Sequence, residues 1–287
     1  MTLLYTILSL SISGIVAAVI LYLIAQQFKI DEDPRIDEVE NELPLANCGA
    51  CGYPGCRNFA EAIVKANSLE EFYCPVGGNE CMAAVSRVMK LEHAKKDPMI
   101  AVVRCNGTLS NCKKTSHYDG AKTCTIETLT YSGDSDCSFG CIGLGECVDS
   151  CPFDAMYMDP KTGLPVIIEE KCTSCGNCVK ACPRNIIEIR KKGPKSRRVW
   201  VSCVNKEKGG VARKSCLVAC IGCGKCVNVC PFDAITLENN LAYIDFEKCK
   251  LCRKCVPVCP TKAIHECHFP PRKKPENKID HNAKVTT

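Results

Sequence analysis

The first hydrophobic segment of the chain is long and carries no charged side chain. Residues 3–28 read LLYTILSLSISGIVAAVILYLIAQQF, and the first charged side chain is that of Lys29. At about 1.5 Å per residue, a helix over these residues is roughly 39 Å long and exceeds the roughly 30 Å hydrocarbon core of a bilayer. The pattern predicts a single transmembrane anchor over residues 1–29.

A cleaved signal peptide is the competing interpretation of this segment. The segment lacks a basic N-terminal region, and no small-residue cleavage site precedes the acidic stretch DEDPRIDEVENE at residues 31–42. We therefore expect a single-pass protein of the cell (inner) membrane. Lys29 directly after the segment favours a cytoplasmic location for everything that follows. The acidic stretch itself predicts a solvated linker.

Beyond the anchor, the hydrophobic segments are short. Residues 57–66 have helical periodicity with Phe59 and Ile63 on one side, and the short runs 165–168 and 242–245 predict strands. Aromatic residues are few, and Trp200 is the one tryptophan. Segments of this kind build only small apolar cores, so another interaction must hold the domains together.

Cysteine supplies that interaction. The chain has 27 cysteines in 287 residues, in spaced groups that indicate reduced thiolates on metal rather than disulfides. Two runs read C-x2-C-x2-C-x3-C-P, the spacing of bacterial two-cluster ferredoxins, in which the fourth cysteine of each run ligates the other cluster. The predicted ligand sets are Cys220, Cys223, Cys226 with Cys259, and Cys249, Cys252, Cys255 with Cys230.

An internal repeat reveals a second unit of the same kind. Residues 137–155 align without gaps on 216–234, and each unit begins with a short strand that leads to Cys105 or Cys203. Leu144 stands where the other unit has Cys223, and Cys137 is the natural replacement ligand. The predicted sets are Cys137, Cys141, Cys147 with Cys182, and Cys172, Cys175, Cys178 with Cys151.

A different cysteine motif follows the acidic stretch. Its spacing is C-x2-C-x4-C-x17-C-P, and its glycines let backbone amides approach the sulfides of a cluster. It predicts one 4Fe-4S cluster on Cys48, Cys51, Cys56 and Cys74, with a zinc site as the alternative. Cys81 opens the next helix and is expected to pack rather than to ligate.

Seven cysteines lie outside these sets: Cys81, Cys105, Cys112, Cys124, Cys203, Cys216 and Cys267. The spacing leaves two interpretations of Cys216 open, a relic of the repeat or a ligand. In the second case Cys105, Cys124, Cys203 and Cys216 bind something further. Cys112 and Cys267 have no pattern around them. We therefore expect five 4Fe-4S clusters, with a sixth possible.

The predicted fold is α+β: an N-terminal transmembrane helix, a small cysteine-rich 4Fe-4S domain, and two tandem two-cluster ferredoxin units in βαβ-βαβ order. Short helices are expected after Cys151, Cys182, Cys230 and Cys259. The predicted domains are 1–29 (transmembrane anchor), 30–96 (N-terminal 4Fe-4S domain), 97–192 (first ferredoxin unit), 193–269 (second ferredoxin unit) and 270–287 (disordered basic tail).

The formal net charge is +5, and the basic side chains gather in the run RKKGPKSRR at residues 190–198. Lys206, Lys208, Arg213 and Lys214 extend this run. It is either a solvated surface or a docking patch for an acidic redox carrier. No aromatic residues are interleaved with the basic ones, so nucleic acid is not an expected partner.

Motifs for other cofactors and for bond chemistry are missing. The sequence has no G-x-G-x-x-G after a strand, no phosphate loop and no nucleophile–base constellation. We expect no NAD or flavin on this chain and no catalytic residue, so its activity is one-electron transfer.

The uncharged N-terminal segment, the motif CGACGYPGC with its distant Cys-Pro, and CSFGCIGLGEC together resemble the B subunits of Rnf (Rsx) complexes, over nearly the whole chain. These complexes are membrane-bound ferredoxin:NAD+ oxidoreductases. The resemblance implies a protein that takes electrons from soluble reduced ferredoxin and passes them to membrane subunits. From there they reach flavins and a separate NAD-binding subunit, and the transfer drives Na+ or H+ export. A second complete ferredoxin unit and the basic tail depart from one-unit members.

Chain position suggests an order for the relay. Electrons arrive at the second ferredoxin unit, cross the first, and leave from the Cys48 cluster, which follows the anchor most closely. Three other functions are weighed against this one: the iron–sulfur subunit of a formate dehydrogenase or dimethyl sulfoxide reductase, a membrane-tethered zinc-binding interaction module, and a corrinoid-linked protein.

Overall fold

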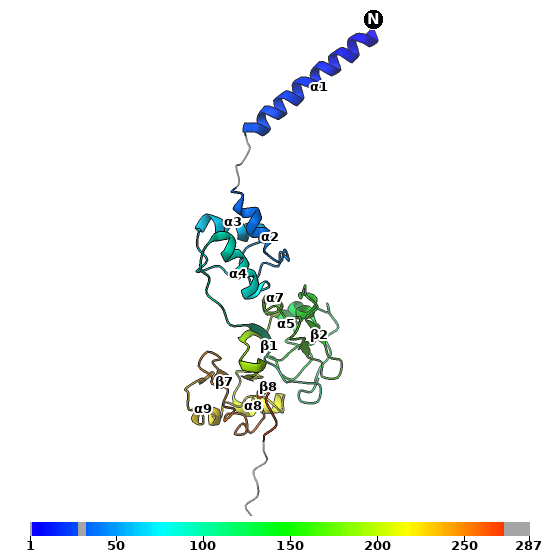
Figure 1. Cartoon of the computed structure of the whole chain (residues 1–287). Helices are drawn as coiled ribbons and strands as arrows, with labels where there is room; N and C mark the ends of the chain where they lie inside the picture. The colour runs from blue at the N-terminus through cyan, green and yellow to red at the C-terminus, as the bar shows by residue number, and fades with distance from the viewer. Residues whose placement is uncertain (1, 28–32, 273–287) are drawn as a thin grey trace, which may run out of the picture.

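The computed structural model describes residues 2–27 and 33–272 (Figure 1). Helix α1 (Thr2–Gln27) is one continuous helix, and its segment Tyr5–Ile24 is long and apolar enough to cross a membrane. Large side chains along it, such as Leu10 and Leu21, are exposed rather than packed on the rest of the chain. The end of the expected anchor, and most of the expected tail at 270–287, lie outside the described residues.

Three helices form the domain that follows. They are α2 (Arg35–Asn41), α3 (Cys56–Ala66) and α4 (Gly78–Met89). The helix expected at residues 57–66 is thus confirmed as α3. The expectation of a solvated linker at residues 31–42 is wrong, because Val39 of α2 is fully buried against the core of Phe59, Ile63 and Met82.

The physical reason lies in the spacing of the apolar residues within the acidic stretch. Ile36, Val39 and Leu43 recur at intervals of three and four and face α3 and α4. Arg57 of α3 pairs with the acidic residues Asp37 and Glu40 of α2 at 3.0 and 2.7 Å.

The next segment contains four strands in two antiparallel pairs. Its elements are β1 (Met99–Val103), α5 (Cys124–Thr130), α6 (Glu146–Asp149), β2 (Met156–Met158), β3 (Pro165–Ile167), α7 (Asn177–Ala181) and β4 (Ile187–Lys191). Strand β1 pairs with β4, and β2 pairs with β3. The first and last strands therefore close the unit.

The last segment repeats this strand scheme. Its elements are the short 3-10 turn η1 (Pro194–Ser196), β5 (Arg198–Val201), α8 (Gly209–Ser215), α9 (Lys225–Asn228), β6 (Ile235–Glu238), β7 (Leu241–Ile244) and β8 (Ile264–Cys267). Strand β5 pairs with β8 and β6 with β7. Between β7 and β8, where every residue is described, the chain forms turns and no helix.

The structure confirms a mixed helix and strand fold but not a βαβ-βαβ order in both units. Helices were expected after the crossover cysteines, but α6 and α7 lie before them. Helices α6 and α7 end at Asp149 and Ala181, before Cys151 and Cys182, and each carries the third cysteine of its run. Proline follows each crossover cysteine and disfavours helical geometry at the residue before it, so the helix ends early.

The expected basic surface at residues 190–198 is interrupted by two buried arginines. Arg190 is 1% exposed, donates to the Ile244 carbonyl at 2.7 Å, pairs with Glu188 and lies over the Tyr243 ring at 5.2 Å. Arg198 is 5% exposed and pairs with Glu169. These residues join the two ferredoxin units, so the run is not a continuous solvated face.

We predict that Arg190→Met destabilises the contact between the two units by about 2–4 kcal/mol. The substitution removes hydrogen bonds from a charged donor and leaves the Ile244 carbonyl buried without its partner. Anaerobic urea unfolding, followed by cluster absorbance, measures the effect. Arg87→Met on the exposed face of α4 is the matched control and should change nothing. An equal midpoint for both variants contradicts this role of Arg190.

Removing iron should unfold the two ferredoxin units before the N-terminal domain. The units' cores are partly built from cysteines such as Cys178, Cys226 and Cys255, whereas the N-terminal core is built mainly from apolar side chains such as Phe59 and Met82. Hydrogen exchange after anaerobic chelation checks this: strands β5 and β8 should lose protection, and helices α3 and α4 should keep part of theirs. Unchanged protection in β5 and β8 contradicts the expectation.

Candidate iron-sulfur centres

The four predicted ligands of the N-terminal motif gather at the start of α3. Cys48 and Cys51 lie in the preceding loop, and the amide of Cys56 donates to Asn47 Oδ1 at 2.8 Å. Gly52 has φ +90°, a conformation that a side chain rarely adopts. Burial raises the pKa of Cys51, and the thiolates of Cys74 and Cys48 raise it further. The sulfurs of Cys48, Cys51 and Cys74 are therefore close neighbours.

Cys81, which is not a predicted ligand, contacts Cys74 of the predicted N-terminal set. A hydrogen bond from the Cys81 thiol lowers the pKa of Cys74 to about 6, and the pKa of Cys81 itself is raised by the same bond and by burial. The Gly77 amide also donates to Cys74 Sγ at 3.4 Å. Both contacts favour the thiolate of Cys74, the form in which a cysteine binds iron.

In the second ferredoxin unit, each predicted ligand set lines one cavity. Cys220, Cys223, Cys226 and Cys259 line the first of these cavities. Cys230, Cys249, Cys252 and Cys255 line the other. Each cavity thus combines three closely spaced cysteines of one run with the fourth cysteine of the other run, which is the crossover that the spacing predicts.

In the first unit, one predicted set is brought together and the other only in part. The Cys178 thiol interacts with Cys172, Cys175 and Cys151. Cys141, Cys147 and Cys182 are also neighbours. Cys137 lies instead beside Cys112, and its Sγ accepts from Asn205 Nδ2 at 3.5 Å.

Cys124 lies where the spacing of the motif predicted Cys137. It is the first residue of α5, after the N-cap Thr123, and it reaches both Cys141 and Cys147. Spacing alone misses Cys124 because this residue is far from Cys141 in sequence. Its position at a helix start, as for Cys56, is the local signal that it shares with an expected ligand.

Burial makes the negative charge of these thiolates costly. It raises the pKa of Cys178 and Cys255 to about 12 and that of Cys147 and Cys226 to about 11, and neighbouring thiolates add to the effect. All 27 cysteines are free thiols. Iron cations offset the repulsion between neighbouring thiolates. The sites therefore fit a bound metal cluster better than they fit a group of metal-free thiolates.

The spread of the sulfurs fits a cluster as well. Within residues 2–27 and 33–272, no three cysteine, histidine or carboxylate side chains converge closely enough to hold a single metal ion. A cubane does not need such convergence, because each of its four thiolates binds a different iron atom.

Cysteines of different sites also adjoin one another. Cys255 interacts with Cys226 across the two sites of the second unit, and Cys178 interacts with Cys147 across those of the first. The thiolate of Cys48 raises the pKa of Cys175, so the N-terminal site lies against the first unit. Figure 1 shows this domain next to α7, the helix that follows Cys175.

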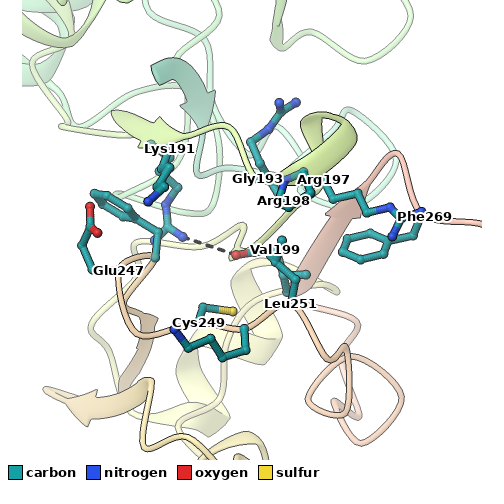
Figure 2. A pocket seen from close by; sticks show the side chains of 13 residues that line it. Lys191, Gly193, Arg197, Arg198, Val199, Glu247, Cys249, Leu251 and Phe269 are labelled. Atoms are coloured by element: carbon teal, nitrogen blue, oxygen red, sulfur yellow. Dashed lines mark hydrogen bonds between the residues drawn. The ribbon is translucent and has the colours of Figure 1, made fainter. Parts of the chain in front are cut away.

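A basic cavity of about 410 Å³ opens beside one predicted ligand (Figure 2). Lys191, Arg197 and Lys250 line it, together with Cys249 and the ring of Phe269. Figure 2 shows lining side chains from separate segments: Lys191 at the end of β4, Arg197 just before β5, and Cys249 in the loop after β7. Positive charge is thus placed next to a cluster ligand.

Three family models match the cysteine-rich segments. The model described as "4Fe-4S dicluster domain" matches residues 137–186 and 219–263. "4Fe-4S double cluster binding domain" matches 171–233, and "Putative Fe-S cluster" matches 43–75. These matches show iron–sulfur cluster domains in the cysteine-rich part of the chain.

Curated relatives cover most of the chain. It is 44% identical over 84% of its length to the B subunit of the Na+-translocating ferredoxin:NAD+ oxidoreductase complex of Acetobacterium woodii, covering 71% of that protein. It is 38% identical over 86% of its length to the proton-translocating counterpart of Clostridium ljungdahlii, covering 86% of it. It is 39% identical over 88% of its length to the B subunit of an ion-translocating oxidoreductase complex of Methanosarcina acetivorans, covering 93% of that protein.

The resemblance noted from the sequence is thereby confirmed. The identity is 38% or more to each of the three relatives, and the match spans more than two thirds of each of them. The chain belongs to the family of B subunits of Rnf-type, ion-translocating ferredoxin:NAD+ oxidoreductase complexes.

Proposed function

We propose that this chain is the electron-relay subunit of a membrane-bound ferredoxin:NAD+ oxidoreductase. It accepts electrons from reduced soluble ferredoxin and passes them through five 4Fe-4S clusters to membrane subunits. The transfer is coupled to Na+ or H+ translocation, and the relatives' names include both ions. Flavin and NAD belong to other subunits of the complex, where two electrons and one proton convert NAD+ to NADH.

The observation that carries this proposal is that cysteines of neighbouring sites adjoin one another, within each ferredoxin unit and between the first unit and the N-terminal site. In the second unit, Cys255 adjoins Cys226 of the other site. In the first unit Cys147 adjoins Cys178, and Cys175 adjoins Cys48 of the N-terminal site. A protein that only stored clusters or used them to fold has no need of such contacts between sites, whereas a relay depends on them.

Exposure gives the relay a direction. Cys223 and Cys252, both in the second unit, are the two exposed cysteines of the 27. Each has exposed lysines beside it, Lys225 next to Cys223 and Lys250 and Lys254 around Cys252. Exposed ligands let a donor come close, and the lysines attract an acidic one. Electrons therefore arrive at the second unit and leave from the Cys48 site, which follows α1.

The chain's own residues do three things in this mechanism. The thiolates bind the clusters, which supply one-electron carriers when bound. Backbone amides such as those of Gly77 and Ala263 donate to ligand sulfurs Cys74 and Cys259 at 3.4 and 3.3 Å, which tunes potential. Buried ligands such as Cys178, Cys226 and Cys255 keep water away from part of the path.

Helix α1 fixes the relay at the membrane. We assign it as a single-pass anchor of the cell (inner) membrane, with all cysteine-bearing domains on the cytoplasmic side. The charge-free span followed by Lys29 supports this orientation. Twenty-seven reduced cysteines fit a reducing compartment and not an oxidising one.

Substituting Cys48 by serine in the intact complex should stop electron delivery to the membrane subunits. The ferredoxin-type clusters should still be reduced by ferredoxin, because they lie upstream of the Cys48 site. Ferredoxin-driven NAD+ reduction and cluster absorbance measure the two parts separately. Cys267→Ser, whose thiol in β8 lies outside all predicted ligand sets, is the control. NAD+ reduction at the normal rate in Cys48→Ser refutes this order of sites.

Reversing the charge of Lys250 and Lys254 should slow reduction of the chain by ferredoxin. Both lysines are exposed around Cys252, and loss of electrostatic attraction predicts a decrease of about 3–10-fold at low ionic strength. Stopped-flow mixing with reduced ferredoxin, at low and at high salt, gives the rate constant. Lys161→Glu, in the exposed turn between β2 and β3, should leave it unchanged. An equal loss in this control shows that only net charge matters.

A further inference from the structure

A separate cavity between the two ferredoxin units is lined mostly by cysteines outside the predicted ligand sets. The cysteines around it are Cys105, Cys112, Cys137, Cys141, Cys203 and Cys216. Of these, Cys137 and Cys141 are predicted ligands of the first unit. Cys112 and Cys137 belong to the first unit by sequence, yet both pack in the core of the second.

Four of these cysteines form one connected group, which we call the junction quartet: Cys105, Cys112, Cys137 and Cys216. The thiols of Cys112 and Cys216 share a hydrogen bond. Cys105 interacts with both Cys112 and Cys137, and Cys216 with Cys105. Cysteines from distant parts of the sequence thus meet in one place.

Gly107 lies at the centre of three of them. A Cβ atom on Gly107 would lie 3.4 Å from Cys112 Cβ, 3.5 Å from Cys105 Sγ and 3.8 Å from Cys216 Sγ. A side chain at position 107 would occupy the space between Cys105, Cys112 and Cys216.

Hydrogen-bond donors point at the sulfurs of the junction quartet. The amides of Gly107 and Cys141 donate to Cys105 Sγ at 3.4 and 3.5 Å. Asn205, which is 1% exposed, donates from Nδ2 to Cys137 Sγ at 3.5 Å. Backbone N–H groups likewise face Cys112 and Cys216. Cysteines that only pack as small hydrophobes need no such donors, whereas sulfurs of iron–sulfur centres commonly accept them.

We propose that the junction quartet binds a sixth 4Fe-4S cluster, and that Cys124 completes the first unit's set with Cys141, Cys147 and Cys182. The two halves of the proposal support each other. Cys124 fills the place that Leu144 leaves vacant, and this releases Cys137 for the junction quartet. Both surplus cysteines of the aligned repeat, Cys137 and Cys216, then have the same role at one shared site.

The sixth site lies where the relay changes from one unit to the other. The Cys141 amide donates to Cys105 Sγ, which joins the junction quartet to the first unit. Cys203 interacts with both Cys137 and Cys220, which joins it to the second. This role rests on the proposed electron relay, but the metal content of the site does not.

Iron and acid-labile sulfide in anaerobically purified full-length protein test the site. Wild type should contain about 24 iron atoms per chain, and Cys112→Ser and Cys216→Ser about 20, since each cubane holds four irons. Cys267→Ser should match wild type. The absorbance of the remaining clusters shows that a variant has folded. About 20 irons in wild type and in both variants overturns the proposal, as does one zinc ion or a Cys112–Cys216 disulfide in place of the missing iron.

Double variants decide which cysteine belongs to which cluster. Cys112→Ser with Cys137→Ser should lose about four irons, because both residues ligate one cluster, and Cys112→Ser with Cys124→Ser should lose about eight. A loss of about eight irons in the first double variant and about four in the second places Cys137 in the first unit's cluster and overturns the proposal. Reduction by ferredoxin is measured on the same samples. If wild-type protein contains about 20 irons and ferredoxin still reduces it, the proposal of a sixth cluster is overturned while the proposed electron relay stands.

Discussion

The structure depends on the bond between iron and buried thiolates. Burial alone disfavours ionised cysteine, and it raises the pKa of Cys178, Cys226 and Cys255 well above the usual thiol value. Bringing several such groups together is unfavourable unless cations lie between them. The small apolar cores around Ile187 and Ile244 cannot supply the missing stability by themselves. The same bonds that hold these domains together therefore also carry the electrons.

The two ferredoxin units act as one body because charged side chains cross between them. Arg190 and Arg198 reach from the end of the first unit and the start of the second to carbonyl, carboxylate and ring partners on the other side. Trp200 Nε1 donates to the Val103 carbonyl at 3.1 Å and adds an apolar contact with Ile100 and Val102. A relay needs fixed distances between its sites, and this buried junction provides them.

Regular cysteine spacing predicts the second unit's ligand sets, and the structure brings the cysteines of each set to one cavity, because such motifs are local in sequence. Contacts between distant segments were not predictable in this way. The acidic character of residues 31–42 concealed the apolar side of α2, and Arg190 looked like a surface residue until its partners in the other unit were known. Cys124 has no spacing signature at all. The fold brings it to Cys141, and only the structure shows this proximity.

In the proposed relay, electrons cross the second unit before they reach the Cys48 site. The most direct test is the rate at which reduced ferredoxin reduces the Cys48 cluster in full-length protein whose C-terminal cluster is removed by Cys249→Ala. Freeze-quench electron paramagnetic resonance follows that cluster. The relay predicts a rate constant at least about 10-fold lower than in wild type, because the exposed point of arrival is lost. An unchanged rate constant contradicts the claim and places the arrival of electrons at the N-terminal domain.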